Sequence, residues 1–170
     1  MLVTREADYA IRCVLEVARH GRVSAARVAE LQDISPTFLG KIVQSLARAG
    51  ILSTRRGVGG GLSLAVPLES ITVLRVIEAV EGPLCLNDCV ATPPQCPQIA
   101  TCPVYPYLDR AQSALRVLLD VNLAELMNPP AGDDAAGPAP ELRELRTDDV
   151  PAIGANGASA PRVATIGGDV

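Results

Sequence analysis

The chain has 170 residues, which is enough for one domain with an appendage. Hydrophobic residues make up 48% of it and aromatic residues only 2%, so much of the apolar content is Ala and Val, and helices are favoured over strands. No apolar run approaches the roughly 18 residues of a membrane span. Charges stand where a signal peptide would be apolar, so we expect a cytoplasmic protein without a membrane segment or structural disulfides.

The net charge of −4 is unevenly distributed along the chain. Residues 1–83 carry ten Lys and Arg against eight Asp and Glu, whereas residues 128–170 carry three against seven. The acidic total therefore does not exclude nucleic acid as a partner of the N-terminal part. The last segment is rich in Pro, Gly, Ala and Asp and has no aromatic residue, so we predict a disordered tail over 128–170.

Two helices are predicted in the first 31 residues. Thr4 is a candidate N-cap for a segment whose apolar residues recur at helical spacing, and Gly21 follows its end. Ser24 is a candidate cap for a second, short helix that runs through Leu31. We expect Val28 and Leu31 to face the core from this second helix.

A third helix is predicted between Ser35 and Gly50. Ser35 followed by Pro36 is a typical helix start, and Gly50 stands where a C-terminal glycine is favoured. Its expected buried residues are Leu39, Ile42, Val43 and Leu46. Two short helices joined by a tight turn, the second strongly capped, predict a helix-turn-helix.

Residues 51–66 predict a β-hairpin with a glycine-rich tip, because two short alternating segments flank it. A hairpin directly after a recognition helix is a wing. Arg55 and Arg56 stand at its base, and Gly60 lets the tip approach a DNA backbone closely. A dinucleotide loop is excluded, because the glycine pattern that starts at Gly57 is not completed and leads into a strand rather than a helix.

The exposed start of the third helix is expected to read bases. Thr37, Phe38 and Lys41 are the candidate base contacts, with Ser35 near a phosphate. Phe38 has two interpretations, a contact to a thymine methyl group or packing against the core.

Two further helices complete the predicted elements. Residues 72–81 form the first, closed by Gly82-Pro83. Residues 107–127 read as one helix of about 30 Å with a long apolar stripe. Because little chain remains to cover that stripe, we predict dimerisation through it, with an intramolecular core helix as the alternative. A two-fold dimer would read two DNA half-sites about 34 Å apart.

The chemistry is concentrated in residues 84–106, which hold Cys85, Cys89, Cys96 and Cys102. Several prolines in and after this stretch exclude a helix and stiffen the loop. A stiff loop that directs several thiols toward one point is typical of a metal or cluster site.

Three chemistries compete for these thiols. Structural zinc usually shows two closely spaced pairs, but the gaps here are three, six and five residues. A thiol redox switch needs only two exposed cysteines. An iron–sulfur cluster tolerates wider spacing and is favoured. Cys13 lies near the apolar face of the first helix and is expected to be a core residue.

Four motifs carry a family resemblance: T-x-x-x-D-Y-A-I-R at 4–12, I-S-P-T-F-L at 34–39, R-G-V-G-G-G-L-S-L at 56–64 and E-G-P at 81–83. Together they make residues 1–127 resemble the IscR/NsrR (Rrf2) family of dimeric iron–sulfur transcription regulators. The resemblance implies that Cys89, Cys96 and Cys102 bind the cluster. Cys85 is then an extra thiol and an alternative fourth ligand.

The fourth ligand separates branches of that family. IscR-like members have a histidine three residues after the last cysteine, where this chain has Tyr105. NsrR-like members use an N-terminal aspartate before a tyrosine, supplied by the partner subunit, and Asp8-Tyr9 matches it. The resemblance therefore implies Asp8 as a ligand and favours a 4Fe–4S cluster, with 2Fe–2S as the alternative.

The expected fold is thus mainly α: a winged helix-turn-helix over 1–83, a cysteine-rich cluster-binding loop over 84–106, and a long C-terminal dimerisation helix. The resemblance implies a homodimeric repressor that binds a double-stranded DNA operator and senses nitric oxide, redox or iron–sulfur status. The alternative is a zinc-stabilised or thiol-redox winged-helix protein without a cluster. We expect no enzyme, because no nucleophile–base pair, phosphate loop or placed acid pair is found.

Overall fold

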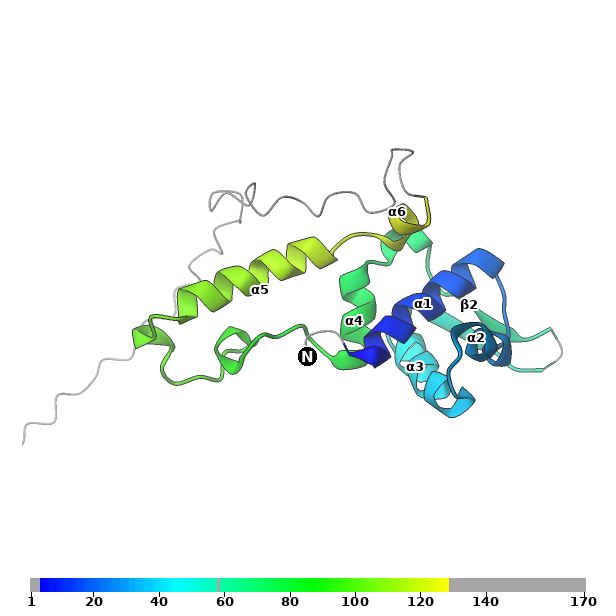
Figure 1. The fold of residues 1–170 in the computed structure, drawn as a ribbon, viewed down its shortest axis with the longest axis horizontal. Coiled ribbons are helices and arrows are strands. Elements are labelled where there is room, and N and C mark those ends of the chain that lie inside the picture. The colour runs from blue at the N-terminus through cyan, green and yellow to red at the C-terminus, as the bar shows by residue number, and fades with distance from the viewer. Residues whose placement is uncertain (1–3, 58, 129–170) are drawn as a thin grey trace, which may run out of the picture. The chain divides into compact units, whose positions relative to one another are not determined.

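The computed structural model describes residues 4–57 and 59–128 (Figure 1). The mainly helical chain with one small antiparallel sheet agrees with the expected fold class. The predicted tail beyond residue 128 lies outside the described residues. The elements are α1 (Arg5–His20), α2 (Ala25–Gln32), α3 (Pro36–Arg48), β1 (Leu52–Arg55), β2 (Gly61–Leu64), η1 (Leu68–Ser70), α4 (Val73–Glu81), η2 (Asp88–Val90), η3 (Ile99–Thr101), α5 (Tyr105–Leu119) and α6 (Leu123–Met127).

Side-chain caps begin the first four α-helices, the first three at the predicted cap residues and the fourth at Thr72, the predicted first residue of that helix. The Thr4 hydroxyl accepts a hydrogen bond from the Glu6 amide at 3.1 Å. Ser24, Ser35 and Thr72 each accept one from the amide three residues later, at 3.2 Å. A cap of this kind supplies an acceptor to an amide that has no partner within the helix, which is why these positions begin helices.

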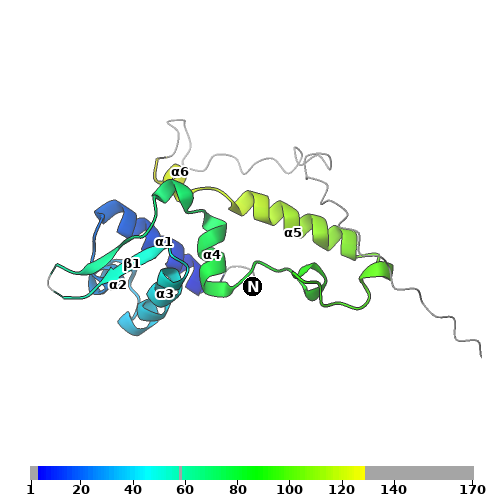
Figure 2. The same ribbon diagram turned by 180° about the vertical axis from the view of Figure 1, so that it is seen from behind.

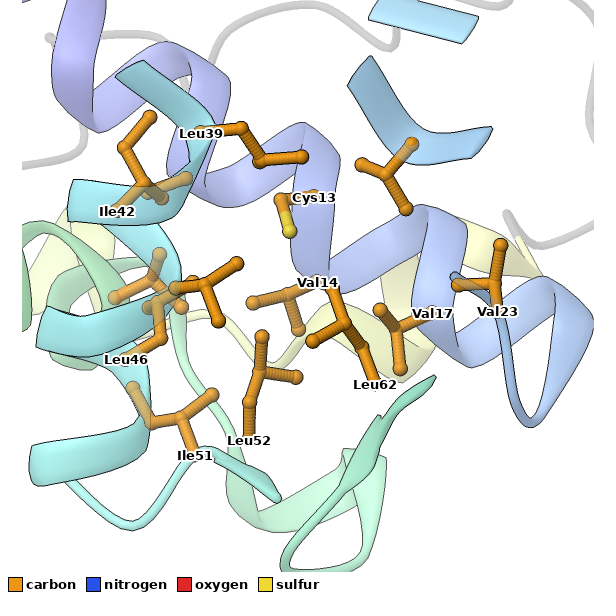
Figure 3. Packing of buried hydrophobic residues seen from close by; sticks show 14 of the residues in the cluster. Cys13, Val14, Val17, Val23, Leu39, Ile42, Leu46, Ile51, Leu52 and Leu62 are labelled. Carbon is orange, nitrogen blue, oxygen red and sulfur yellow. The ribbon is translucent and has the colours of Figure 1, made fainter. Parts of the chain in front are cut away.

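The core lies between α1, α3 and the hairpin, as Figure 3 shows. All four residues predicted for the buried face of α3 are buried. Leu31 is different: it is 41% exposed, so the prediction that it faces the core is wrong. The chain turns back directly after α2, where the Ile34 amide donates to the Ala29 carbonyl, and Ile34 packs on the core. Ala29 is buried in place of Leu31.

The hairpin forms as predicted and is tied to the helices. β1 and β2 pair antiparallel, with Leu52 opposite Leu64 and Arg55 opposite Gly61. Leu62 also exchanges two backbone hydrogen bonds with Val23 in the link between α1 and α2, at 2.7 and 3.1 Å. The base of the wing is therefore held by the helix-turn-helix as well as by its own strand pairing.

The predicted single helix over 107–127 is wrong. The chain forms α5 and, after a break at 120–122, the short helix α6. Asn122 caps α6, accepting from the Glu125 amide at 2.9 Å. At the rise of an α-helix, the 15 residues of α5 span about 22 Å rather than 30 Å.

Backbone pairing with the segment before α4 accounts for the break. The Val73 amide donates to the Val121 carbonyl at 3.0 Å, and the Leu123 amide donates to the Ile71 carbonyl at 2.9 Å. Leu123 is fully buried in the same cluster as the helix-turn-helix core. A continuous helix could not make these bonds, because the Val121 carbonyl and the Leu123 amide would already be paired within it.

Helix α4 connects the helix-turn-helix to the C-terminal part of the described chain. It packs against α1 and α3 on one side and contacts α5 on the other, and it lies between them in both views (Figures 1 and 2). Within the described residues, no helix is long and apolar enough to span a membrane.

Candidate functional site

The N-terminal end of α3 presents three of the four predicted DNA-contact side chains to solvent. Ser35, Thr37 and Lys41 are exposed. Phe38 is half-buried, packs against the core cluster, and meets the Tyr9 ring edge-to-face with centroids 5.9 Å apart. The structure therefore shows the packing of Phe38, and its contact to a thymine methyl group stays a prediction.

The wing places its basic residues on the surface. Arg55 and Arg56 are exposed, and neither guanidinium pairs with a carboxylate within the described ranges. The tip needs glycine at Gly60, where an added Cβ would collide with the Arg55 carbonyl oxygen. Gly61 has φ +145°, and an added Cβ would lie 2.8 Å from the Val23 carbonyl oxygen. Unpaired guanidiniums on a tight turn suit phosphate contacts.

Cys13 is a core residue, as predicted. It lies on α1 with its sulfur among apolar side chains such as Val14 and Leu39 (Figure 3). Burial, reinforced by the negative charge of Glu16, raises the pKa of the Cys13 thiol to about 12. Because the thiolate is the reactive form, Cys13 is unsuited to ligation or redox chemistry.

The four loop cysteines occupy different environments. Cys89 lies in η2, which packs against α5, and is 7% exposed. Cys96 and Cys102 are half-buried, and Cys85 is exposed with its thiol donating to the Asn87 carbonyl at 3.1 Å. Between residues 84 and 104 the loop contains no α-helix, as predicted, only the short turns η2 and η3. Helix α5 begins at Tyr105, two residues before the predicted start.

The structure does not gather three of these thiols at one point. Among residues 4–57 and 59–128, no group of three or more His, Cys, Asp or Glu side chains is placed to hold a metal ion. Three thiolates are a soft donor set of the kind that iron–sulfur clusters use, so the residue types fit while the loop conformation does not. Binding a cluster would require Cys89, Cys96 and Cys102 to move toward one another.

Asp8 lies on the surface of α1, in its first turns. Its carboxylate is half-exposed and pairs with Arg12 one turn later, with Nη2 3.1 Å from Oδ2 and Nε 3.1 Å from Oδ1. The structure does not group Asp8 with the loop cysteines of the same chain. An exposed ion pair of this kind contributes little stability. The Asp8 carboxylate can therefore leave Arg12 and bind another partner at a small cost in free energy.

A cluster of polar contacts at the start of the loop was missed by the sequence analysis. Gln112 of α5 is 8% exposed and hydrogen-bonds the backbone at Leu84 and Leu86. Glu78 of α4 binds the Leu84 amide and Arg116 of α5. The available signal was a glutamine placed four residues after Leu108, inside an apolar stripe, where a buried amide must find partners.

A shallow pocket of about 270 Å³ opens beside these contacts. It is lined by the end of α4 and the first loop residues, including Glu81, Gly82 and Cys85. The Thr4 hydroxyl donates to the Glu81 carboxylate, which joins the N-terminus of α1 to the start of the loop. The E-G-P motif and the helix that carries Asp8 are thus direct neighbours.

Comparison with known proteins finds transcription regulators. The family model Rrf2, described as an iron-dependent transcriptional regulator, matches residues 3–129. The chain is 34% identical over 131 residues to protein rrf2 of Nitratidesulfovibrio vulgaris, covering 75% of this chain and 87% of that protein. It is 49% identical over 59 residues to the regulator IscR of Cereibacter sphaeroides, covering 35% and 38% of the two chains.

Two solved structures share the fold. IscR of T. potens superposes with a TM-score of 0.61 at 24% identity, covering 81% of this chain and 94% of that one. CymR, the global cysteine regulator of B. subtilis, gives 0.59 at 23% identity, covering 74% and 95%. These similarities confirm the winged-helix fold. The matching family and the IscR relative are described as transcriptional regulators, not as enzymes, in agreement with the expectation.

Proposed function

Because the chain belongs to the Rrf2 family of DNA-binding transcriptional regulators, we propose that it is a cytoplasmic homodimeric repressor controlled by an iron–sulfur cluster. The cluster is held by Cys89, Cys96 and Cys102, with Asp8 of the partner subunit as the fourth ligand and 4Fe–4S as the favoured form. Nitric oxide, redox state or iron–sulfur status is the signal, and loss of the cluster releases the operator.

The DNA-binding half of the proposal is supported by the exposed basic and polar residues of α3 and the wing. Ser35, Thr37 and Lys41 read or position the duplex, while Arg55, Arg56 and the Gly60 tip contact the backbone or minor groove. The unpaired state of both arginines supports this assignment, because no ion pair with a described residue has to be broken on binding.

Self-association is supported by apolar side chains left exposed on α5. Tyr107 is 72% exposed and Val117 62%, and Leu118 is exposed on the same helix. Exposed apolar side chains along one helix are favourable to bury against a second copy. Leu123, in contrast, is already used in the core of its own chain and is unavailable to a partner.

The cluster is supported above all by one observation: three cysteines with gaps of six and five residues follow a winged helix in a family described as iron-dependent. Their soft thiolates suit iron, whereas the carboxylate of Asp8 is a harder and more easily displaced ligand. When bound, the cluster would supply iron that nitric oxide or oxygen can attack.

A second candidate is supported by the accessibility of three loop thiols, since Cys85 is exposed and Cys96 and Cys102 are half-buried. In it, the same winged helix responds through thiol oxidation or a zinc ion, without iron. Such a regulator would need only two of the loop cysteines.

Anaerobic purification of the full chain tests the two candidates. We expect a brown protein that contains iron and acid-labile sulfide and loses both in Cys89→Ser, Cys96→Ser and Cys102→Ser. Cys85→Ser is the matched control and should keep them, while Asp8→Ala should change the Mössbauer spectrum. A colourless protein with one zinc per chain would support the second candidate. Absence of iron and sulfide, with failed reconstitution, would overturn the first.

A further inference from the structure

The segment that leads from α4 into the cysteine loop is held by two side chains from different helices. On α4, one carboxylate oxygen of Glu78 accepts from the Leu84 amide at 3.1 Å and lies 2.8 Å from the guanidinium of Arg116 on α5. A single oxygen thus joins α4, the start of the loop and α5. Charge-assisted bonds of this kind are shorter and stronger than neutral ones.

The second side chain is Gln112, the one buried polar residue among those described. Its amide nitrogen donates to the Leu84 carbonyl, and its oxygen accepts from the Leu86 amide at 3.0 Å. Both ends of the carboxamide are therefore satisfied by the loop backbone. A buried carboxamide that loses either bond is costly, so Gln112 holds residues 84–86 in one register along α5.

These contacts lie between the DNA-binding domain and Cys89. On one side, α4 packs against α1 and α3, and its Val76 belongs to the core cluster. On the other, η2 with the nearly buried Cys89 packs against α5 three residues beyond Leu86. Residues 84–86 therefore lie along the chain between Cys89 and the contact with Glu78 on α4.

We propose that Glu78, Gln112 and Arg116 form a polar junction that positions Cys89 and couples its displacement to the DNA-binding domain. They are positioning residues, since each acts on the loop backbone or on another side chain. The positioning half of the proposal, that the junction holds Cys89 in place, stands on the hydrogen bonds above. The regulatory half, that displacement of Cys89 changes DNA binding, rests on the proposed function.

Thiol alkylation of the full chain without metal tests the positioning half. In Gln112→Met, which keeps the side-chain volume but removes both hydrogen bonds, we expect Cys89 to react about tenfold faster with iodoacetamide. Free glutathione at a fixed concentration serves as the reference thiol, and the labelling of Cys89 is read by site-resolved mass spectrometry. Arg116→Gln should raise the same ratio, and Arg110→Gln, an exposed arginine on the same helix, should leave it unchanged.

An unchanged ratio of Cys89 to glutathione reactivity in Gln112→Met would overturn the positioning role. If that variant does not fold, Glu78→Gln replaces it, because it keeps an acceptor for the Leu84 amide and removes only the ion pair. Its matched control is Glu69→Gln, an exposed carboxylate in η1, and an unchanged ratio in Glu78→Gln would again count against the junction.

The regulatory half is tested with reconstituted protein and an operator selected from random duplex DNA by the wild type. The readout is the ratio of operator Kd without and with the cluster. We expect Arg116→Gln to lower this ratio at least threefold at unchanged iron and sulfide content, with Arg110→Gln as control. An unchanged ratio, or equal weakening of both forms, would overturn the coupling. A wild type without a cluster would overturn the proposed function and the coupling, while alkylation would still decide the positioning.

Discussion

The wing arginine Arg56 gives the most direct test of how the winged helix holds DNA. It follows β1 at the base of the glycine tip, is exposed, and pairs with no carboxylate in the described part of the chain. Arg56→Ala therefore removes one positive charge without breaking an ion pair or opening the core. We expect stability to change by less than about 0.5 kcal/mol and DNA affinity to fall.

The size of the effect follows from counterion release. Each phosphate contact contributes about 0.9 to the slope of log affinity against log salt, so a dimer with one Arg56 contact per wing loses about 1.8. Between about 50 and 200 mM salt, the ratio of wild-type to variant DNA affinity should then fall about twelvefold. One contact per duplex would shrink it only about 3.5-fold.

Fluorescence anisotropy of a labelled operator duplex, titrated with full-length protein at several KCl concentrations, measures both slopes. Arg110→Ala on α5 is the matched control, because it removes an exposed arginine that also lacks an ion pair with any described residue. Parallel slopes for wild type and Arg56→Ala would refute the phosphate contact. A loss near 0.9 would instead indicate that a single wing engages the duplex.

Three further substitutions test the fold and the site. Leu123→Ala should destabilise the protein by about 2–5 kcal/mol, because Leu123 is fully buried, while Leu126→Ala, at a side chain 49% exposed, should cost far less; thermal unfolding of both separates a core role from a purely interfacial one. Burial raises the pKa of Cys13 to about 12, so the folded state holds the thiol proton more tightly than the unfolded state does. The resulting contribution to the free energy of unfolding is complete below about pH 9 and is lost as pH rises toward 12. Urea unfolding at about pH 8 and 10.5 should therefore show a steeper loss in wild type than in Cys13→Ala, and equal losses would contradict the shift. Gly60→Ala should weaken operator binding with little change in Tm, because an added methyl collides with the Arg55 carbonyl oxygen at the exposed tip; normal affinity would show that the tip adapts freely.

Local signals accounted for most of the DNA-binding domain. Ser35, Pro36 and Gly50 act on their own backbone neighbours, so their effect can be read without knowing the rest of the fold. The same holds for the hairpin, whose glycines permit a turn that other residues would obstruct. The family resemblance built on these segments is confirmed by the match over residues 3–129.

Predictions failed where a distant contact decided the outcome. Leu31 has the right spacing for a buried position, but Ile34 from the following turn packs on the core and Leu31 is left exposed. The apolar repeat continues past residues 120–122 as if one helix did, and a local sign of the break is Asn122 with Glu125 three residues later, a helix-start pattern that the prediction left out. The break is made by pairing with the backbone around Thr72, some fifty residues earlier in the chain.

The break also changes what the apolar residues of the C-terminal part can do. A single helix over 107–127 would present Leu119 and Leu123 on one interface, whereas the structure gives Leu123 to the core of its own domain. Any dimer contact is therefore confined mainly to α5. The same helix carries Gln112, so one helix has an apolar exposed side available to a second copy and a buried polar contact with the loop that bears Cys89. If two copies associate through α5, a change at the cysteine loop acts on the helix that sets the separation of the two DNA-binding domains.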